Sequence, residues 1–132
     1  MRVVQMDVSI YLLKQVVTVL ACRGLKFTVE LAAKSDLAFH FNARFNERSK
    51  KVIVRNSLIA KKWGKEERDL EHFPFIQGQP FEILCTNKEF KVAVNKSHLL
   101  EFKHRITNLS SVDTLSIFFD LTLSSVNMEN IP

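Results

Sequence analysis

Short apolar runs recur along the chain, and they predict β-strands rather than helices. Each run is rich in β-branched and aromatic residues, and the runs follow one another at intervals of eight to fifteen positions. Polar segments such as AAKS, NERSK, QGQP, NKS and NLSS separate them and favour turns. Strands are predicted at residues 16–20, 25–31, 36–42, 51–57, 81–85, 90–95, 98–103, 112–118 and 121–126.

Connections this short cannot contain crossover helices, so we expect the strands to pair antiparallel. The pattern therefore predicts an all-β fold, either a sandwich or a barrel. The segment KKWGKEERDLEHF carries charge pairs at helical spacing, but Gly64 within it disfavours a helix. Because no Pro- or Ser-rich linker and no internal repeat divides the sequence, residues 1–132 are predicted to form a single domain.

The composition fits a folded domain with a phenylalanine-rich core. The chain has 132 residues, of which 46% are hydrophobic and 25% charged, and it contains 11 Phe but only three Gly and three Pro. Near the N-terminus, the run SIYLLKQVVTVLAC is too short to span a bilayer and is interrupted by Lys14 and Gln15. We interpret this run as a strand, with a cleaved leader as the alternative.

The formal charge of +5 raises the question of nucleic-acid binding. The basic residues are spread along most of the chain, however, and no helix-turn-helix, zinc-finger or aromatic-rich RNA-binding signature accompanies them. We therefore interpret them as a solvated surface. Cys22 and Cys85 are too few and too far apart for a disulfide framework or a metal site, so we predict reduced structural thiols, no metal and no cofactor.

Polar side chains concentrate on two of the predicted strands. Strand side chains alternate between two faces, so DLAFHFNARF presents one apolar and one polar face. The apolar face would carry Leu37, Phe39 and Phe41, and the polar face His40, Asn42 and Arg44. In the later stretch VIVRN, Val54 and Asn56 share a face, at a distance along the chain that suits a return strand beside the first.

A third polar stretch, WGKEER, contains the single tryptophan. If it is extended, Glu66 and Arg68 share a face, and Trp63 would reach them through a turn at Gly64. Side chains of Asn, His, Glu and Arg supply both donors and acceptors for sugar hydroxyls. An indole face can lie against the C–H groups of a pyranose that has an axial hydroxyl, so a galactose-type sugar fits the set.

These stretches resemble the motifs of the galectins, the β-galactoside-binding lectins, in which H-x-N-P-R is followed by V-x-N and W-x-x-E-x-R. HFNAR, VIVRN and WGKEER match this pattern in order and spacing except at one position. The resemblance covers about residues 25–126, whereas residues 1–20 match weakly. It implies a jelly-roll-like sandwich of two antiparallel sheets with a shallow sugar-binding groove on one of them and no catalytic step.

The resemblance also implies a role for each matched residue. One group would bind the axial 4-hydroxyl of galactose, namely His40, Asn42 and Arg44. Asn56 would bind the 6-hydroxyl and Trp63 would stack on the ring, while Val54 completes the second motif. Glu66 and Arg68 would reach the adjoining glucose or N-acetylglucosamine and orient Arg44. The pair His104 and Arg105 matches the family too, and we interpret it as structural.

The expected partners are therefore β-galactoside glycans of the lactose or N-acetyllactosamine type. Family behaviour implies a cytosolic protein with leaderless export to the extracellular space, and it adds nuclear presence and homo-oligomers as further expectations. No membrane insertion is expected.

The sequence departs from the family pattern at several places. Ala43 replaces the usual proline, which removes a fixed φ angle beside Arg44 and is expected to weaken preorganisation without loss of the site. Phe119 replaces a glycine of the turn near the C-terminus, where a positive φ would strain a phenylalanine. The customary Pro-Gly opening is missing from the N-terminus, which leaves the first strand of the sandwich in doubt.

Two other functions compete with sugar binding. A glycoside hydrolase needs two acids about 5–10 Å apart, and among Glu66, Glu67 and Glu71 no second acid is expected on the face of Glu66, so we predict no enzyme. A galectin-like domain that has lost galactoside binding and serves as a protein-interaction module is the alternative, because a fold can persist while its site changes.

Overall fold

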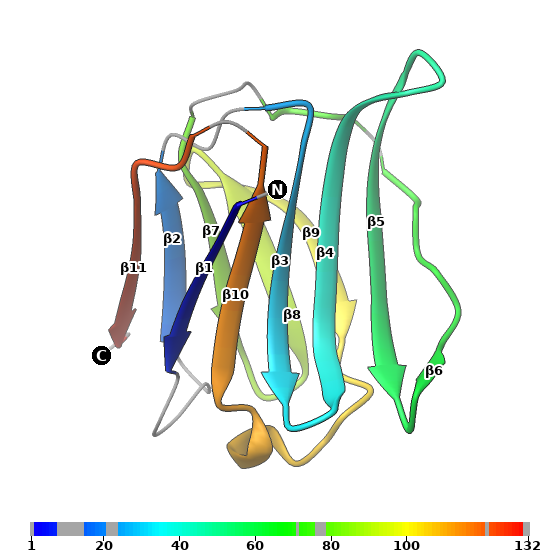
Figure 1. Cartoon of the computed structure of the whole chain (residues 1–132), viewed down its shortest axis with the longest axis vertical. Coiled ribbons are helices and arrows are strands. Elements are labelled where there is room, and N and C mark those ends of the chain that lie inside the picture. Colours follow the sequence, from blue (N-terminus) through cyan, green and yellow to red (C-terminus); the bar gives the residue numbers. More distant parts are fainter. Residues whose placement is uncertain are drawn as a thin grey trace.

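Two antiparallel β-sheets lie face to face in the computed structural model (Figure 1). The structure describes residues 2–7, 15–20, 24–70, 72–75, 79–120 and 122–130. One sheet has six strands in the order β1-β10-β3-β4-β5-β6, and the other has five in the order β11-β2-β7-β8-β9. The predicted all-β sandwich of two antiparallel sheets is confirmed.

The bounds of the strands follow the pairing of each with its neighbours. The six-stranded sheet contains β1 (Arg2–Asp7), β10 (Thr114–Phe119), β3 (Lys26–Ala33), β4 (Asp36–Glu47), β5 (Lys50–Ile59) and β6 (Lys62–Trp63). The five-stranded sheet contains β11 (Ser125–Asn130), β2 (Gln15–Leu20), β7 (Phe81–Cys85), β8 (Glu89–Val94) and β9 (Ser97–Lys103). A short 3-10 helix, η1 (Leu109–Ser111), precedes β10.

The core lies between the sheets and is rich in phenylalanine, as predicted. Phe39 of β4 stacks on Phe90 of β8, with 4.7 Å between the ring centroids. Phe27 of β3 stacks in the same way on Phe81 of β7, at 4.8 Å. Each of these four rings is at most 3% exposed. Burying one such ring stabilises the fold by about 1.5–3 kcal/mol, so stacking across the gap fixes the two sheets against each other.

All nine predicted strands overlap an observed strand, but β1 and β6 are not predicted. The edge strand β1 pairs only with β10, and β6 has two residues, so both depend on tertiary pairing more than on local pattern. The C-terminal strand is predicted at 121–126, whereas β11 lies four residues further along the chain, at Ser125–Asn130, in register with β2. Within the predicted N-terminal run, residues 9–14 and 21–22 lie outside the described residues, and β2 occupies its centre.

Tight turns lengthen the hairpins beyond the predicted strand ends. The turns Arg48–Ser49 and Ala60–Lys61 each place two consecutive residues at positive φ, between 50° and 69°. Such two-residue turns match the twist of the paired strands but usually require Asn-Gly. Because these positions hold no glycine, the strands were predicted to end too early. The turn at Ala60–Lys61 brings Trp63 back beside Leu58, so the prediction of a turn at Gly64 is wrong.

A bulge at Ala38 changes the predicted faces of β4. Leu37 pairs with Ala32 on β3 and Leu58 on β5, whereas Phe39 pairs with Leu31, so Ala38 is the extra residue. Leu37 therefore lies on the outer face with Ala32 and is half-buried, in contrast to the prediction.

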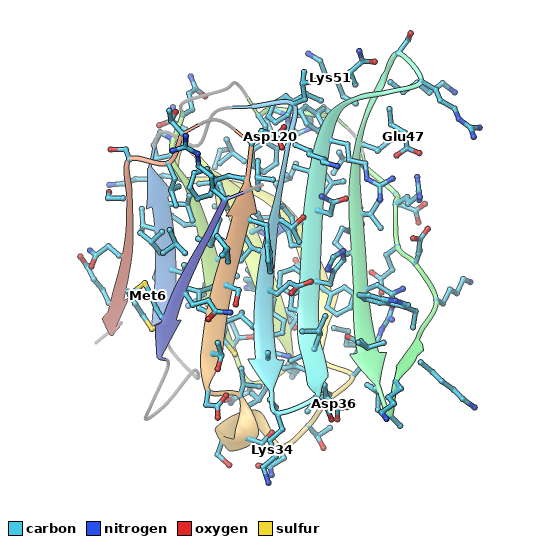
Figure 2. All side chains as sticks on the ribbon, in the orientation of Figure 1. Met6, Lys34, Asp36, Glu47, Lys51 and Asp120 are labelled. Atoms are coloured by element: carbon cyan, nitrogen blue, oxygen red, sulfur yellow. The ribbon has the colours of Figure 1, made fainter. Side chains whose placement is uncertain are left out.

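Phe119 and Ala43, the two substitutions relative to the family pattern, fit into their strands, and Phe119 does so without the expected strain. Phe119 lies in β10 opposite Phe27, is 7% exposed, and is not among the residues with positive φ in the described part of the chain. The next residue, Asp120, accepts hydrogen bonds from the backbone N–H groups of Leu25 and Lys26 at 2.9 and 3.1 Å, which fixes the entry into β3 (Figure 2). Ala43 is fully buried within the β4 ladder.

Candidate functional site

A shallow depression of about 350 Å³ lies on the outer face of the six-stranded sheet, over β4, β5 and β6. Most of the predicted site residues line it, together with Gly64: His40, Arg44, Val54, Asn56, Trp63 and Glu66. The other two predicted residues adjoin it. Asn42 is only 6% exposed and is bonded to Arg44, whereas Arg68 is paired with Glu66.

Strand register explains why the three motifs meet. On β5, Asn56 lies opposite His40 and Val54 opposite Asn42, so the second motif stands beside the first. The tryptophan ring of β6 is 52% exposed and lies edge-on to the His40 ring, with 4.9 Å between the centroids and 66° between the planes. An exposed indole beside a row of polar groups is the arrangement that the sequence predicted.

His40 is held from the side by an acid that was not predicted. Its Nδ1 atom lies 2.7 Å from Oε2 of Glu30 on β3, and the two residues pair directly across the strands. A carboxylate accepts the Nδ1 proton and leaves Nε2 as the ring nitrogen that is free to contact a ligand. Glu30 alternates with Thr28 on the outer face of β3, and this period of two is the signal that could have revealed it.

Asn42 serves mainly to hold Arg44. Its Nδ2 group donates to the backbone oxygen of Phe27 and to the hydroxyl of Thr28, both at 2.9 Å. Its Oδ1 atom accepts a hydrogen bond of 2.6 Å from Nε of Arg44. Both amide protons of Asn42 are therefore in use, and only Oδ1 keeps a lone pair that could accept from a sugar hydroxyl.

Four side chains of alternating charge are linked by ion pairs at the edge of the depression. Arg44 donates to Glu47 at 2.6 Å, Arg68 donates to Glu47 at 3.3 Å, and Arg68 also donates to Glu66 at 3.0 Å. Glu66 does not contact Arg44 directly in these ion pairs. It is linked to Arg44 through Arg68 and Glu47, because Glu47 bonds to both arginines. Glu47 was assigned to a turn by its sequence and therefore escaped the site prediction.

The ion pairs at the edge of the depression favour the charged forms of Glu47 and Arg68. The hydrogen bond from Arg44 is the main cause of the lowered pKa of Glu47, and Arg68 adds to the effect. Hydrogen bonds to Glu66 and then to Glu47 raise the pKa of Arg68. Glu47 is also a second acid on the face of Glu66, contrary to the expectation of none. Its lowered pKa opposes the role of a general acid, which needs a raised one.

The segment after β6 is tied to β5 by a buried arginine. The backbone groups of Arg55 and Glu67 form two hydrogen bonds, at 2.9 and 3.0 Å. The guanidinium of Arg55 is 4% exposed and donates to the backbone oxygens of Ile53 and Asp69. Burial lowers the pKa of Arg55, although nearby Glu67 and Asp69 oppose this effect. These bonds hold Glu67, and with it the neighbouring Glu66 and Arg68, beside β5.

The remaining candidate residues lie outside the site or outside the described chain. Cys85 is a free buried thiol, and burial raises its pKa to about 12, which fits an unreactive structural role. Cys22 and Glu71 lie outside the described residues. Among the residues that the structure describes, no group of three His, Cys, Asp or Glu side chains could hold a metal ion, and no helix is long and apolar enough to cross a membrane.

Comparisons with known proteins agree with this fold. The family model for galactoside-binding lectins matches residues 13–128. Galectin-3 from Mus musculus is 46% identical over 104 residues, which cover 77% of this chain and 39% of that protein. Galectin-8 from Rattus norvegicus is 47% identical over 104 residues, which cover 76% of this chain and 32% of that protein.

Solved structures give the same result. Sheep galectin-11, solved as a complex with glycerol, has a TM-score of 0.76 and 28% sequence identity, with 96% of each chain covered. The galectin LEC-6 of Caenorhabditis elegans has a TM-score of 0.84 at 23% identity, covers 98% of this chain and 92% of its own, and supports the fold alone.

The molecule is thus a β-sandwich lectin by its fold and its family. This chain belongs to the galactoside-binding lectin family, the galectins. It spans less than half the length of the curated relatives named above.

Proposed function

We propose that this domain binds β-galactosides of the lactose or N-acetyllactosamine type in the depression over β4, β5 and β6, without catalysis. The observation that carries the proposal is the half-exposed indole of Trp63, which stands beside His40 on the rim of a depression that Arg44 and Asn56 also line. An indole is normally buried in a core. Its exposure beside hydrogen-bonding groups suits a ring that has one polar and one apolar side.

Each side chain has a role in this proposal. The axial 4-hydroxyl of galactose contacts Nε2 of His40, the guanidinium of Arg44 and the remaining lone pair of Asn42. Asn56 donates to the 6-hydroxyl, while the ring lies against Trp63 and Val54 forms the floor. Glu66 and Arg68 meet the adjoining glucose or N-acetylglucosamine.

Affinity for one disaccharide is limited by its size. Lactose has about 23 non-hydrogen atoms, and at about 0.3 kcal/mol per atom its binding free energy reaches about 7 kcal/mol, or a dissociation constant of about 10 μM. We therefore propose that function depends on self-association or on clustered glycans, because multivalency multiplies a weak affinity by about 10² or more. Agglutination of cells by a strictly monomeric sample at low concentration would contradict this.

Family membership also supports a proposed location. We propose that the protein is cytosolic, reaches extracellular glycans by leaderless export, and is present in the nucleus as well. Fluorescent tagging of the whole protein and assay of the culture medium for it test each compartment separately.

The alternative function is a protein-interaction module without galactoside binding. The divergent residues 1–20 favour it, whereas the open depression and the linked charges around Arg44 favour the lectin.

A lactose-agarose column separates the two functions. We expect wild-type protein to be retained and to be eluted by free lactose, and we expect Trp63→Ala to pass through the column as folded protein. Circular dichroism of each sample establishes that it is folded. Flow-through of folded wild-type protein would refute the lectin and favour the interaction module, and unchanged retention of Trp63→Ala would refute the proposed site.

A further inference from the structure

Arg105 approaches the site from the opposite sheet. It follows β9, the edge strand of the five-stranded sheet on the side where β5 and β6 end the six-stranded sheet (Figure 1). Its guanidinium carbon lies 4.7 Å from the centroid of the Phe102 ring, an arrangement that favours a cation over an aromatic face. Arg105 does not line the depression, so it acts on a ligand only through other residues.

Within the described part of the chain, the guanidinium makes three hydrogen bonds, all of them to the second and third motifs. Nη1 donates to Oδ1 of Asn56 at 2.7 Å. Nη2 donates to the backbone oxygen of Lys65 at 2.7 Å and to Oε2 of Glu67 at 2.9 Å. A planar guanidinium holds several acceptors in one fixed geometry, which a lysine ammonium does not reproduce. Arg105 therefore ties Asn56 on β5 to the segment after Trp63.

These bonds leave the carboxamide of Asn56 with a single unused group. Its Oδ1 accepts from Arg105 and also from the backbone N–H of Ser57 at 2.8 Å, which uses both lone pairs. Its Nδ2 gives one proton to the backbone oxygen of Gly64 at 2.9 Å. Because the other hydrogen-bonding positions of the carboxamide are in use, the second Nδ2 proton is what Asn56, which is 3% exposed, can present to a ligand in the depression.

Gly64 leaves the space that this arrangement needs. A Cβ atom at position 64 would lie 2.8 Å from Nη1 of Arg105 and 3.2 Å from Oδ1 of Asn56. Both distances are shorter than ordinary van der Waals contacts. The glycine of the third motif thus permits the close approach of Arg105 to Asn56.

We infer that Arg105 is a positioning residue that orients the Asn56 carboxamide, so that this amide only donates and the ligand group opposite it must accept a hydrogen bond. The inference rests on the proposed function and extends it, since it makes selection of the galactose 6-hydroxyl depend on a residue outside the three motifs. Without Arg105, Oδ1 loses its charged donor and regains a free lone pair, and only the backbone bonds to Ser57 and Gly64 still orient the amide. Galactosides with and without the 6-hydroxyl then become more alike in affinity.

The test compares lactose with 6′-deoxylactose, in which hydrogen replaces the galactose 6-hydroxyl, by isothermal titration calorimetry. A buried donor left without a partner is costly, so wild-type protein is expected to prefer lactose about tenfold. In Arg105→Met, which keeps the apolar stem over Phe102 but has no donors, the preference falls to about twofold. Lys103→Met, which removes a cation from the exposed face of β9, keeps the tenfold preference.

The ratio of the two affinities separates positioning from a general loss of structure. If Arg105→Met weakens both ligands equally and keeps the tenfold ratio, the inference is overturned. If that variant does not fold, Arg105→Lys takes its place, and a ratio equal to that of the wild type overturns the inference there. Absence of lactose binding by folded wild-type protein refutes the proposed function itself, which is a different outcome from an unchanged ratio.

Discussion

The two halves of the candidate site are built in different ways. On β4 and β5, Asn42 and Asn56 are 6% and 3% exposed, and each is bonded to backbone atoms of a neighbouring segment. After β6, the side chains of Glu66 and Arg68 are 49% and 41% exposed and bond to each other, and Arg68 also bonds to Glu47. Buried polar groups with all their bonds satisfied are held in one geometry, whereas exposed ion pairs contribute little.

This difference implies that the two halves would serve different parts of a ligand. Under the proposed function, the buried half, to which Arg44 is attached through Asn42, is preorganised and would select the first sugar. The exposed half would then contact the second sugar with side chains that water also solvates. Substitutions in the buried half are expected to affect every galactoside, and those in the exposed half only disaccharides.

The largest effect is expected from Arg44→Ala. A hydrogen bond to a charged group contributes about 1.5–3 kcal/mol, so loss of the contact with the 4-hydroxyl weakens binding by more than about tenfold. Methyl β-galactoside and lactose should be affected equally, and lactose-agarose should no longer retain the protein. Arg48→Ala, at the exposed tip of the β4–β5 hairpin, is the matched control and should be retained like the wild type. Retention of Arg44→Ala would show that the buried half does not select the sugar.

The buried half is also the part that the sequence predicted best. Period-two alternation placed His40, Asn42 and Arg44 on one face, and the spacing to VIVRN placed β5 beside β4. The strand β7 has the predicted bounds, 81–85, because its buried positions alternate along FEILC and the polar segment QGQP precedes it. These features are local, so one stretch of sequence carries them.

What the sequence did not predict depends on contacts between distant segments. Glu47 and Arg105 join the site because a tight turn at Arg48–Ser49 extends β4 and because β9 ends beside β5. The bulge at Ala38 moved Leu37 to the outer face, and no glycine or proline marks that position. Local pattern reports which face a side chain prefers but not which partner it meets.

Glu47→Gln is expected to have the next largest effect. Glu47 is the only residue that bonds to both Arg44 and Arg68 in the described part of the chain, and it therefore links the two halves. The hydrogen bonds that a neutral amide oxygen accepts are weaker than those of a carboxylate, so we expect affinity for lactose to fall by about tenfold. Affinity for methyl β-galactoside should fall as well, because Arg44 loses its support. Calorimetry with both ligands measures this, and an effect on lactose alone would assign Glu47 to the exposed half only.

Acid should reproduce that substitution in the wild type. The pKa of Glu47 is lowered from 4.5 in the folded protein, mainly by Arg44, so the carboxylate stays charged at and somewhat below that pH. Its contribution is present above pH 4.5 and is lost as the pH falls through the lowered pKa. The contribution of Glu47 to lactose affinity should therefore be unchanged from pH 8 to pH 5 and decrease only below pH 4.5.

The Glu47→Gln variant is the control for this pH dependence. It has no carboxylate at the position and should show no further acid-dependent loss while circular dichroism reports a folded protein. A parallel decrease in the variant would assign the acid effect to another group.

The smallest effect is expected from Glu66→Gln, in the exposed half. Both side chains of its ion pair with Arg68 are exposed, and such pairs contribute about 0.2–1 kcal/mol. Lactose affinity should therefore fall by about threefold. Methyl β-galactoside has no second sugar and should bind as tightly as it does to the wild type. Calorimetry with both ligands gives the ratio of the two affinities, and this ratio is diagnostic. Equal weakening of both would mean that Glu66 supports Arg44 through Arg68 and Glu47, and that the two halves of the site act as one.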